Sequence, residues 1–292
     1  MLANEKCLKC LFKKNIANAK KFDMDKKDAF AKKIKTLLNE YGDKKTAPHL
    51  QSQIDRMYGE VFGEKRDFSE IKNKYNKFML EKEGIIKNRI FESQDIIEAC
   101  IKFVCAGNYI DFGAVDCVEE SILEALFEKA QTEVIDSHRV EKFKNELKNA
   151  QKLVYLTDNC GEIVVDKIFI EAIKQMFPQL AVTAIVRGGD TLNDATMADA
   201  ITIGLTVLVE TIDNGTDIPG TVMDEISKEA MQKIKNADII ISKGQGNFET
   251  MYGEGFNTYF MFLCKCEMFV ERFGLKQFSS VFANEKDIII KK

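Results

Sequence analysis

Residues 153–162, which read Leu-Val-Tyr-Leu-Thr-Asp-Asn-Cys-Gly-Glu, decide the fold. The four apolar residues at the start of this stretch predict a short buried strand. A segment with apolar residues at helical spacing follows, from about Glu162 to Met176. A fully apolar strand that leads into a helix is typical of a parallel sheet covered on both faces, and therefore of an α/β fold.

The alternation of strands and helices continues toward the end of the chain. We expect a helix near Ile226–Ile234 and further strands at Val182–Val186, Leu205–Val209, Asp238–Ile241, Phe260–Leu263 and Ile288–Ile290. Parallel sheets of this kind bind ligands beyond the carboxyl ends of their strands. The residues that follow each strand are therefore the first candidates for a functional site.

The first half of the chain has a different pattern. Apolar residues recur at helical spacing between lysines and glutamates, for example around Ile34, Cys100 and Leu126, and turn signals such as Tyr41-Gly42-Asp43 separate these runs. The character of the sequence changes near residue 150. We therefore predict a helical domain over residues 1–148 and an α/β domain over residues 149–292.

Composition excludes several classes of protein. The 292 residues include 42 basic and 46 acidic side chains, a net charge of −4 that argues against nucleic acid or an anionic membrane as a partner. No apolar run approaches the roughly 20 residues of a membrane helix. Eight cysteines without a secretory signal indicate free thiols in a reducing cytoplasm. With only two histidines, a metal here needs oxygen or sulfur ligands.

Polar side chains follow three of the predicted strands. Asp158-Asn159 follows the first strand, Arg187 and then Asn193-Asp194 follow the second, and Lys243-Gly244-Gln245-Gly246-Asn247 follows the fourth. Taken alone, the first two loops are more typical of a turn or a helix cap than of a ligand site, and the third is weak evidence for one. Together, at one edge of a sheet, they supply the oxygen ligands that Mg²⁺ or Mn²⁺ prefers, and cations and loop amides that suit a phosphoryl group.

In these motifs the chain resembles the metal-dependent damage-control phosphatases, nearly from end to end. The motifs that carry the resemblance are Cys7-Leu8-Lys9-Cys10, Ala106-Gly107-Asn108-Tyr109-Ile110-Asp111-Phe112, Asp158-Asn159-Cys160-Gly161-Glu162, Arg187 with Asn193-Asp194-Ala195-Thr196, Ser242-Lys243-Gly244-Gln245-Gly246-Asn247-Phe248-Glu249, and Leu263-Cys264-Lys265-Cys266. The resemblance implies a helical N-terminal domain beside a three-layer α/β/α domain. It also implies hydrolysis of small phosphomonoesters, such as sugar phosphates and phosphorylated or damaged metabolites.

The resemblance assigns roles to individual residues. It implies that Asp158, Asn159 and Asp194 bind a divalent ion (Mg²⁺, Mn²⁺, Co²⁺ or Ni²⁺) and that Lys243 contacts the substrate phosphate. Asp158, Asp194 and Lys243 are then the candidate catalytic residues. The wider set expected to bind substrate or phosphate is Asn108, Asp111, Glu162, Arg187, Asn193, Lys243, Gly244, Gly246 and Asn247. The N-terminal Cys7 and Cys10 are typical of the microbial branch.

Several alternatives stay open at the level of sequence. The nucleophile is either a water activated by the metal or one of the two aspartates, Asp158 or Asp194. Cys7 and Cys10 are part of a second metal site, a redox pair, or two thiols that tether the N-terminus. The competing functions are a carboxyl methyltransferase and a non-catalytic regulator that binds a metal or a metabolite. The sequence favours the phosphatase, with a small phosphorylated metabolite as its partner and with no prediction of oligomeric state.

Overall fold

A computed structural model describes residues 1–19, 22–111 and 119–288 of the chain. Its centre is a six-stranded sheet in the order β3-β2-β1-β4-β5-β6, in which only β6 is antiparallel to its neighbour. The strands are β1 (Lys152–Leu156), β2 (Ala181–Val186), β3 (Glu210–Asp213), β4 (Ile239–Lys243), β5 (Thr258–Leu263) and β6 (Ser280–Asn284). The predicted α/β fold with a mostly parallel sheet is confirmed.

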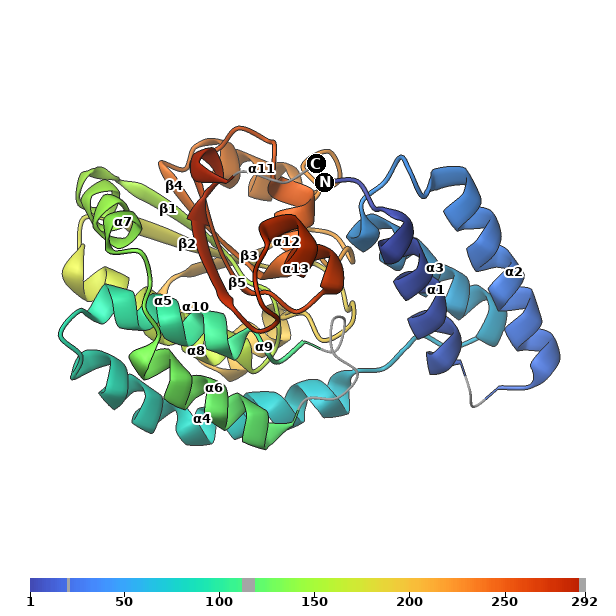
Figure 1. Cartoon of the computed structure of the whole chain (residues 1–292), viewed down its shortest axis with the longest axis horizontal. Helices are drawn as coiled ribbons and strands as arrows, with labels where there is room; N and C mark the ends of the chain where they lie inside the picture. The colour runs from blue at the N-terminus through green and yellow to red at the C-terminus, as the bar shows by residue number, and fades with distance from the viewer. Residues whose placement is uncertain (20–21, 112–118, 289–292) are drawn as a thin grey trace.

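Helices surround this sheet (Figure 1). In the described residues they are α1 (Glu5–Asn18), α2 (Met24–Tyr41), α3 (Ala47–Phe62), α4 (Ser69–Phe91), α5 (Ile96–Gly107), α6 (Glu120–Thr132), α7 (Ser137–Asn149), α8 (Glu162–Met176), α9 (Met197–Thr202), α10 (Leu205–Leu208), α11 (Lys228–Lys235), α12 (Gly244–Met251) and α13 (Glu267–Phe273). The helical character predicted for the first half of the chain is confirmed by α1 to α7.

Two of the predicted strands differ from the structure. Residues 205–208 form α10, and the strand begins only at Glu210. Leu205 is fully buried in the core, so the apolar run marks a helix that packs inward, whereas β3 lies at the sheet edge and is only partly covered. The last strand is β6, because Ile288 lies beyond it, after a short 3₁₀ turn at Glu285–Asp287. Ile289 and Ile290 lie outside the described residues.

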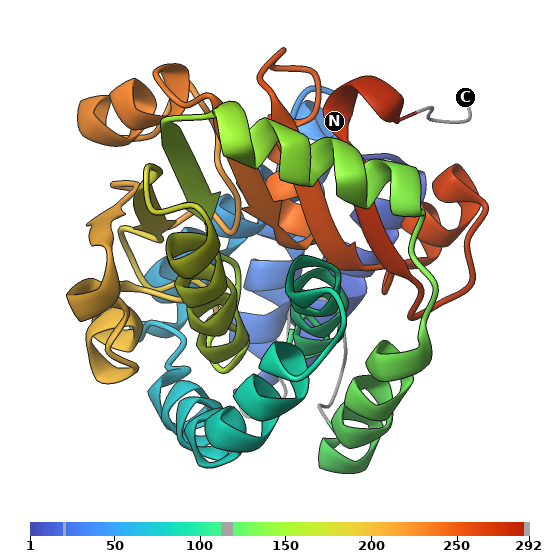
Figure 2. The ribbon, with the colours of Figure 1, turned by 90° about the vertical axis from the view of Figure 1, so that its left-hand side faces the viewer.

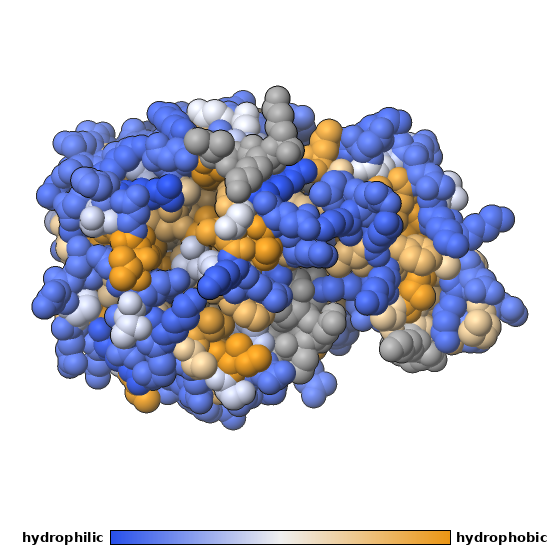
Figure 3. All heavy atoms as spheres, viewed as in Figure 1, coloured by the Kyte–Doolittle hydropathy of each residue, from blue (hydrophilic) through white to orange (hydrophobic). Residues whose placement is uncertain are grey.

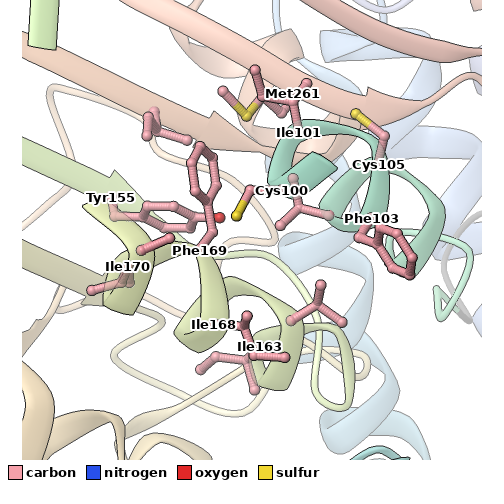
Figure 4. Packing of buried hydrophobic residues seen from close by; sticks show 14 of the residues in the cluster. Cys100, Ile101, Phe103, Cys105, Tyr155, Ile163, Ile168, Phe169, Ile170 and Met261 are labelled. Carbon is pink, nitrogen blue, oxygen red and sulfur yellow. The ribbon is translucent and has the colours of Figure 1, made fainter. Parts of the chain in front are cut away.

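The two faces of the sheet bury alternate residues of each strand, as a pleated strand requires. On one face, Tyr155 and Met261 pack against α5 and α8, with Cys100 and Phe169 between them (Figure 4). On the other face, Leu156 and Phe262 belong to a second cluster that includes residues of α11, α12 and α13. Figure 2 shows α4, α5, α6 and α8 together on one side of the strands. The sheet is therefore the middle layer of three.

The N-terminal helices do not pack as a single unit. Helices α1, α2 and α3 share a core of their own around Phe30, Ile34 and Tyr58. Helices α4 to α7 instead contribute to the cluster that covers the sheet. In Figure 1 the α1–α3 bundle stands beside the sheet layers, at the end where α12 and α13 lie. The domain boundary at residues 148 and 149 stays a prediction, and the packing divides the helices earlier, between α3 and α4.

The face of the molecule in Figure 3 is mainly hydrophilic, with hydrophobic side chains in scattered patches. Among the helices of the described residues, none has both the length and the apolar character needed to cross a membrane.

Candidate active site

The sheet topology creates a crevice between β1 and β4. These strands are neighbours, but β1 leads into α8 on one face of the sheet and β4 leads into α12 on the other. Where adjacent parallel strands lead to opposite faces, their loops separate and leave room for a ligand. A cavity of about 340 Å³ lies at this place, and Asp158, Asn159, Asp194 and Gly246 line it.

Backbone hydrogen bonds hold the loops after β1 and β2 together. The Ala195 amide donates to the carbonyl of Asp158 at 2.7 Å, and the Cys160 amide donates to the carbonyl of Asn193 at 2.8 Å. Asn159 and Asp194 pair between these bonds as an isolated bridge. Main-chain pairing therefore brings Asp194 to Asp158 and Asn159, although the sequence places it 35 residues after Asn159.

The Asp158 carboxylate is held from two sides. Its Oδ2 accepts from Asn108 Nδ2 at 3.0 Å and from Asn159 Nδ2 at 2.7 Å. It also lies against Gly244, where a Cβ atom would be only 2.0 Å from Oδ2. Gly244 has a φ of +82° at the start of α12, so the backbone conformation and the space both require glycine. Gly244 thus shapes the site without touching substrate through a side chain.

Arg187 lies behind the two carboxylates and is not among the residues that line the cavity. Its Nε donates to Asp194 Oδ2 at 2.7 Å, and its Nη2 lies 3.6 Å from Asp158 Oδ1. Its Nη1 donates to the Oδ1 of Asn247 at 3.1 Å. Asn247 in turn donates to the carbonyls of Thr157 and Lys243. The structure thus places Arg187 and Asn247 as supports of the aspartates rather than at the cavity surface.

Lys243 is also outside the cavity lining. Its Nζ is fully buried and donates to Glu162 Oε1 at 2.5 Å, to Asp166 Oδ1 at 2.8 Å and to the carbonyl of Val104. Burial alone would lower the pKa of Lys243, but the Asp166 and Glu162 carboxylates raise it overall. Lys243 is therefore a charged ammonium in this structure, with its donors directed at protein acceptors.

Glu162 connects this buried ion pair to the aspartates. Its Oε2 accepts from Asn108 at 2.8 Å and from Asn159 at 3.1 Å, the same two amides that hold Asp158. Asn108 Oδ1 also accepts from the Leu263 amide, which fixes the orientation of this side chain. Glu162 and Asn108 thus do not line the cavity themselves, but they contact Asp158 and Asn159 and orient them.

Lys265, which follows β5, is one of the lysines among the residues that line the cavity, together with Lys6 and Lys14, and its side chain is fully buried. Its Nζ donates to Asp111 Oδ2 at 2.5 Å and to the carbonyl of Asn108 at 2.6 Å. Asp111 lines the cavity as well. Lys265 was absent from the predicted site, although the Leu263-Cys264-Lys265-Cys266 motif contains it. A lysine directly after an apolar strand was the available signal.

The remaining predicted residues support the loops. Asn193 is buried and donates to the carbonyl of Ile110 at 3.1 Å, which ties the second loop to the end of α5. Gly246 lines the cavity through its backbone. A side chain does not fit at this position, because a Cβ atom would lie 2.2 Å from the carbonyl oxygen of Pro219. These contacts explain why both positions are polar or small.

Cys7 and Cys10 line the same cavity together with Cys266. The cysteines of the described residues are free, and burial raises the pKa of the Cys7 thiol to about 11. In the part of the chain that the structure describes, no group of three or more His, Cys, Asp or Glu side chains is arranged to hold a metal. The second-metal or redox role of Cys7 and Cys10 stays a prediction.

The charges at the strand ends favour a bound cation. Burial, with help from the Asp194 and Glu162 carboxylates, raises the pKa of Asp158 well above its usual value. Burial raises the pKa of Asp194 to about 6, although Arg187 acts in the opposite direction. The side chains that would bind the ion are the carboxylates of Asp158 and Asp194 and the amide oxygen of Asn159. This set fits a hard divalent ion whose remaining ligands are water or phosphate oxygens. The residues present therefore fit the metal that the resemblance implies.

Comparison with known proteins identifies the family. The model of the damage-control phosphatase ARMT1-like domain matches residues 3–281. A damage-control phosphatase of Pyrococcus horikoshii is 31% identical, covering 86% of both chains, and one of Archaeoglobus fulgidus is 29% identical, covering 83% of this chain and 84% of that one. The crystal structure of a DUF89 family protein from P. horikoshii superposes with a TM-score of 0.84 at 28% identity, covering 98% of this chain and 99% of that chain. The chain belongs to the damage-control phosphatase ARMT1-like domain family.

Proposed function

We propose that this protein is a divalent-metal-dependent phosphatase that hydrolyses small phosphomonoesters in metabolite repair. The observation that carries the proposal is that Asp158, Asn159, Asp194 and Lys265 line one cavity at the carboxyl ends of the strands. The names of the Pyrococcus and Archaeoglobus relatives support a phosphatase, and the donor set supports the metal.

Each residue has a role that follows from its contacts. Asp158, Asn159 and Asp194 would hold the ion, which would withdraw charge from a phosphate oxygen and activate a water. Arg187 keeps the Asp194 carboxylate in place at 2.7 Å and limits the repulsion between the two aspartates. Glu162 and Asn108 orient the amide and carboxylate groups from behind.

Lys265 is the residue we assign to the phosphate. Lys265 and its partner Asp111 both line the cavity together with the two aspartates. The Nζ of Lys243 is instead directed at Glu162 and Asp166, neither of which lines the cavity. An ammonium next to the metal stabilises the negative charge of the phosphoryl group in the transition state. Asp111, which pairs with this ammonium, lines the same cavity.

The proposal is tested by phosphate release from an aryl phosphate and from a panel of phosphorylated metabolites with Mg²⁺, Mn²⁺, Co²⁺ or Ni²⁺. We expect turnover that chelation abolishes and that any effective ion restores. Asp194→Asn should weaken metal binding in calorimetry, and Lys265→Met should lower kcat/KM by about 10² or more with metal binding retained. Lys276→Met, at an exposed lysine, is the control.

Two results would contradict the assignment. Full metal-dependent turnover in Asp194→Asn would show that the ligand set is wrong. No release with any of the four ions would favour a regulator that binds a metabolite without converting it.

A further inference from the structure

The cavity has a second wall, built by the α1–α3 bundle and the loop that follows α3. Asn15 of α1, Gln51 of α3 and Arg66 of the loop line it, on the chain segments that face the sheet edge. None of these residues belongs to the set that holds the metal or the phosphate. Their chemistry therefore indicates which further group of a ligand this wall would bind.

Arg66 is a buried cation with only part of its donors in use. Its side chain is 9% exposed, and its Nη1 donates to Asp55 Oδ1 at 2.7 Å. The guanidinium carbon lies 4.6 Å from the centre of the Tyr58 ring, so an aromatic face covers the group. The Nε and Nη2 atoms are buried and have no hydrogen-bond partner among the described residues.

The unused pair of donors has a specific geometry. Nε and Nη2 form one edge of the guanidinium and present two parallel N–H groups, the arrangement that binds both oxygens of a carboxylate or phosphate. Burying such donors without acceptors is costly, so their native state calls for a partner. Arg66 lines the cavity, so a ligand in that cavity lies next to the residue that carries the two unused donors.

Neighbouring side chains hold this arginine in place. Asp55 Oδ2 accepts from Gln51 Nε2 at 3.0 Å, and Gln51 Oε1 accepts from Asn15 Nδ2 at 2.9 Å. Asn15 and Gln51 are 1% and 8% exposed, so this network connects α1, α3 and the loop inside the protein. The resulting site is rigid, as recognition of one fixed group requires.

We infer that Arg66, with Asn15 and Gln51 beside it, forms a second subsite that binds an anionic two-oxygen group at the opposite end of the substrate from the scissile phosphate. The inference rests on the proposed function and narrows its substrate class to small phosphomonoesters that carry a carboxylate or a second phosphate. The cavity volume of about 340 Å³ is at the small end of ligand sites and fits a metabolite with two charged ends.

The test uses non-hydrolysable alkyl phosphonates of two to six carbons, each ending in a methyl, hydroxyl, carboxylate or second phosphonate group. Binding is measured by calorimetry with Mg²⁺ present. We expect an anionic end to tighten binding about tenfold or more over the methyl and hydroxyl ends at one chain length. The carboxylate and phosphonate arms show which oxyanion the subsite prefers.

Variants assign the effect to the guanidinium. Arg66→Met should remove the advantage of the anionic end and leave binding of the methyl-ended compounds unchanged, and Arg66→Lys should restore little of it because the paired donors are lost. Since Asp55 loses its partner in Arg66→Met, the double variant Arg66→Met/Asp55→Asn repeats the test without a buried unpaired charge. Arg56→Met, at an exposed arginine of α3 paired with Asp217, is the matched control.

The outcomes separate this inference from the proposed function. Equal binding of all four series, or an anionic preference that survives in both Arg66→Met variants, would overturn the subsite while phosphatase activity stands. Failure of every phosphonate to bind would overturn the subsite and the phosphatase together.

Discussion

At the scale of single residues, the site depends on the absence of a Cβ atom at Gly244. Gly244 leaves room for Asp158, since its Cβ would lie 2.0 Å from the carboxylate oxygen. Asp158 cannot retreat, because Asn108 and Asn159 hold the same oxygen. A methyl group at residue 244 therefore has to displace the Asp158 carboxylate, which we propose as a metal ligand.

Gly244→Ala should abolish metal binding and turnover. The backbone term alone is about 1–2 kcal/mol, because φ is +82°. Gly204→Ala is the matched control, since Gly204 has a φ of +78° with nothing within 4 Å of its Cβ. The two variants should lose similar stability through the backbone, and only Gly244→Ala should lose calorimetric metal binding. Retained metal affinity in Gly244→Ala would contradict this view of Asp158.

Lys243→Met should act on stability more than on the chemical step. Removal of the ammonium leaves Glu162 and Asp166 buried without their cation, a change that typically costs about 3–5 kcal/mol. Urea unfolding measures the loss. Lys82→Met, which breaks an exposed pair with Glu124, should cost at most about 1 kcal/mol. A folded, equally stable Lys243→Met protein with lowered kcat would instead support direct contact with phosphate.

At the scale of elements, α12 connects the site to the core beneath it. Its Phe248 is fully buried and lies 4.7 Å from the ring centre of Phe260 and 5.4 Å from that of Phe269. The preceding residue, Asn247, bonds to the carbonyls that end β1 and β4. The short helix thereby fixes the loop geometry on which Gly244 and Gly246 depend.

Glu249 of the same helix should make the stability of the protein depend on pH. Burial raises the pKa of Glu249 to about 7, and its Oε2 has no hydrogen-bond partner among the described residues. The folded state thus binds this proton more tightly than the unfolded chain, so stability falls as the pH rises from about 4.5 to 7. The contribution is at most about 3 kcal/mol.

Glu249→Gln should remove this dependence and raise stability at pH 8. Thermal unfolding of both proteins between pH 5 and pH 8 gives the comparison, with an exposed Glu229→Gln variant as the control. Parallel pH profiles for the wild type and Glu249→Gln would contradict the assignment of this proton to Glu249.

At the scale of the whole molecule, the cavity lies between the carboxyl ends of the parallel strands and the α1–α3 bundle. Ion pairs connect the two sides, with Lys6 Nζ 3.3 Å from Glu267 and Arg56 Nη2 2.6 Å from Asp217. Both pairs are exposed and therefore weak. A ligand that touches both walls adds contacts that these pairs alone do not supply.

Mg²⁺ with the carboxylate-ended phosphonate should therefore slow amide hydrogen exchange in α1 and α3 as well as in the strand-end loops. At 100 times its Kd, a ligand stabilises the folded state by about 2.7 kcal/mol, which a Tm shift would also report. Helix α6 packs against α5, and none of its residues lines the cavity, so it should not respond. Protection confined to the strand-end loops would show that the bundle does not contact the ligand.

The sequence by itself determined the α/β class, four of the six strands (β1, β2, β4 and β5) at least in part, and the loops that carry Asp158, Asn159 and Asp194. These follow from local patterns, because apolar runs and polar strand ends are properties of neighbouring residues. The edge strand β3 and the antiparallel β6 were not predicted correctly. β3 is only partly covered and has no apolar run, and the apolar run of β6 is only three residues long, Val281-Phe282-Ala283.

Only the tertiary structure decided which of Lys243 and Lys265 lines the cavity and what forms its second wall. Lys243 and Lys265 both follow apolar strands, and their sequences alone do not separate them. Their directions depend on the carboxylates nearby: Glu162 and Asp166 of α8 hold Lys243 inward, while Asp111 holds Lys265 at the cavity. Arg66 joins the site from a loop with no recognisable motif, because the packing of α1 and α3 brings it there. The packing of whole elements sets the directions of side chains and the contacts between distant residues, so neither can be predicted from the local sequence.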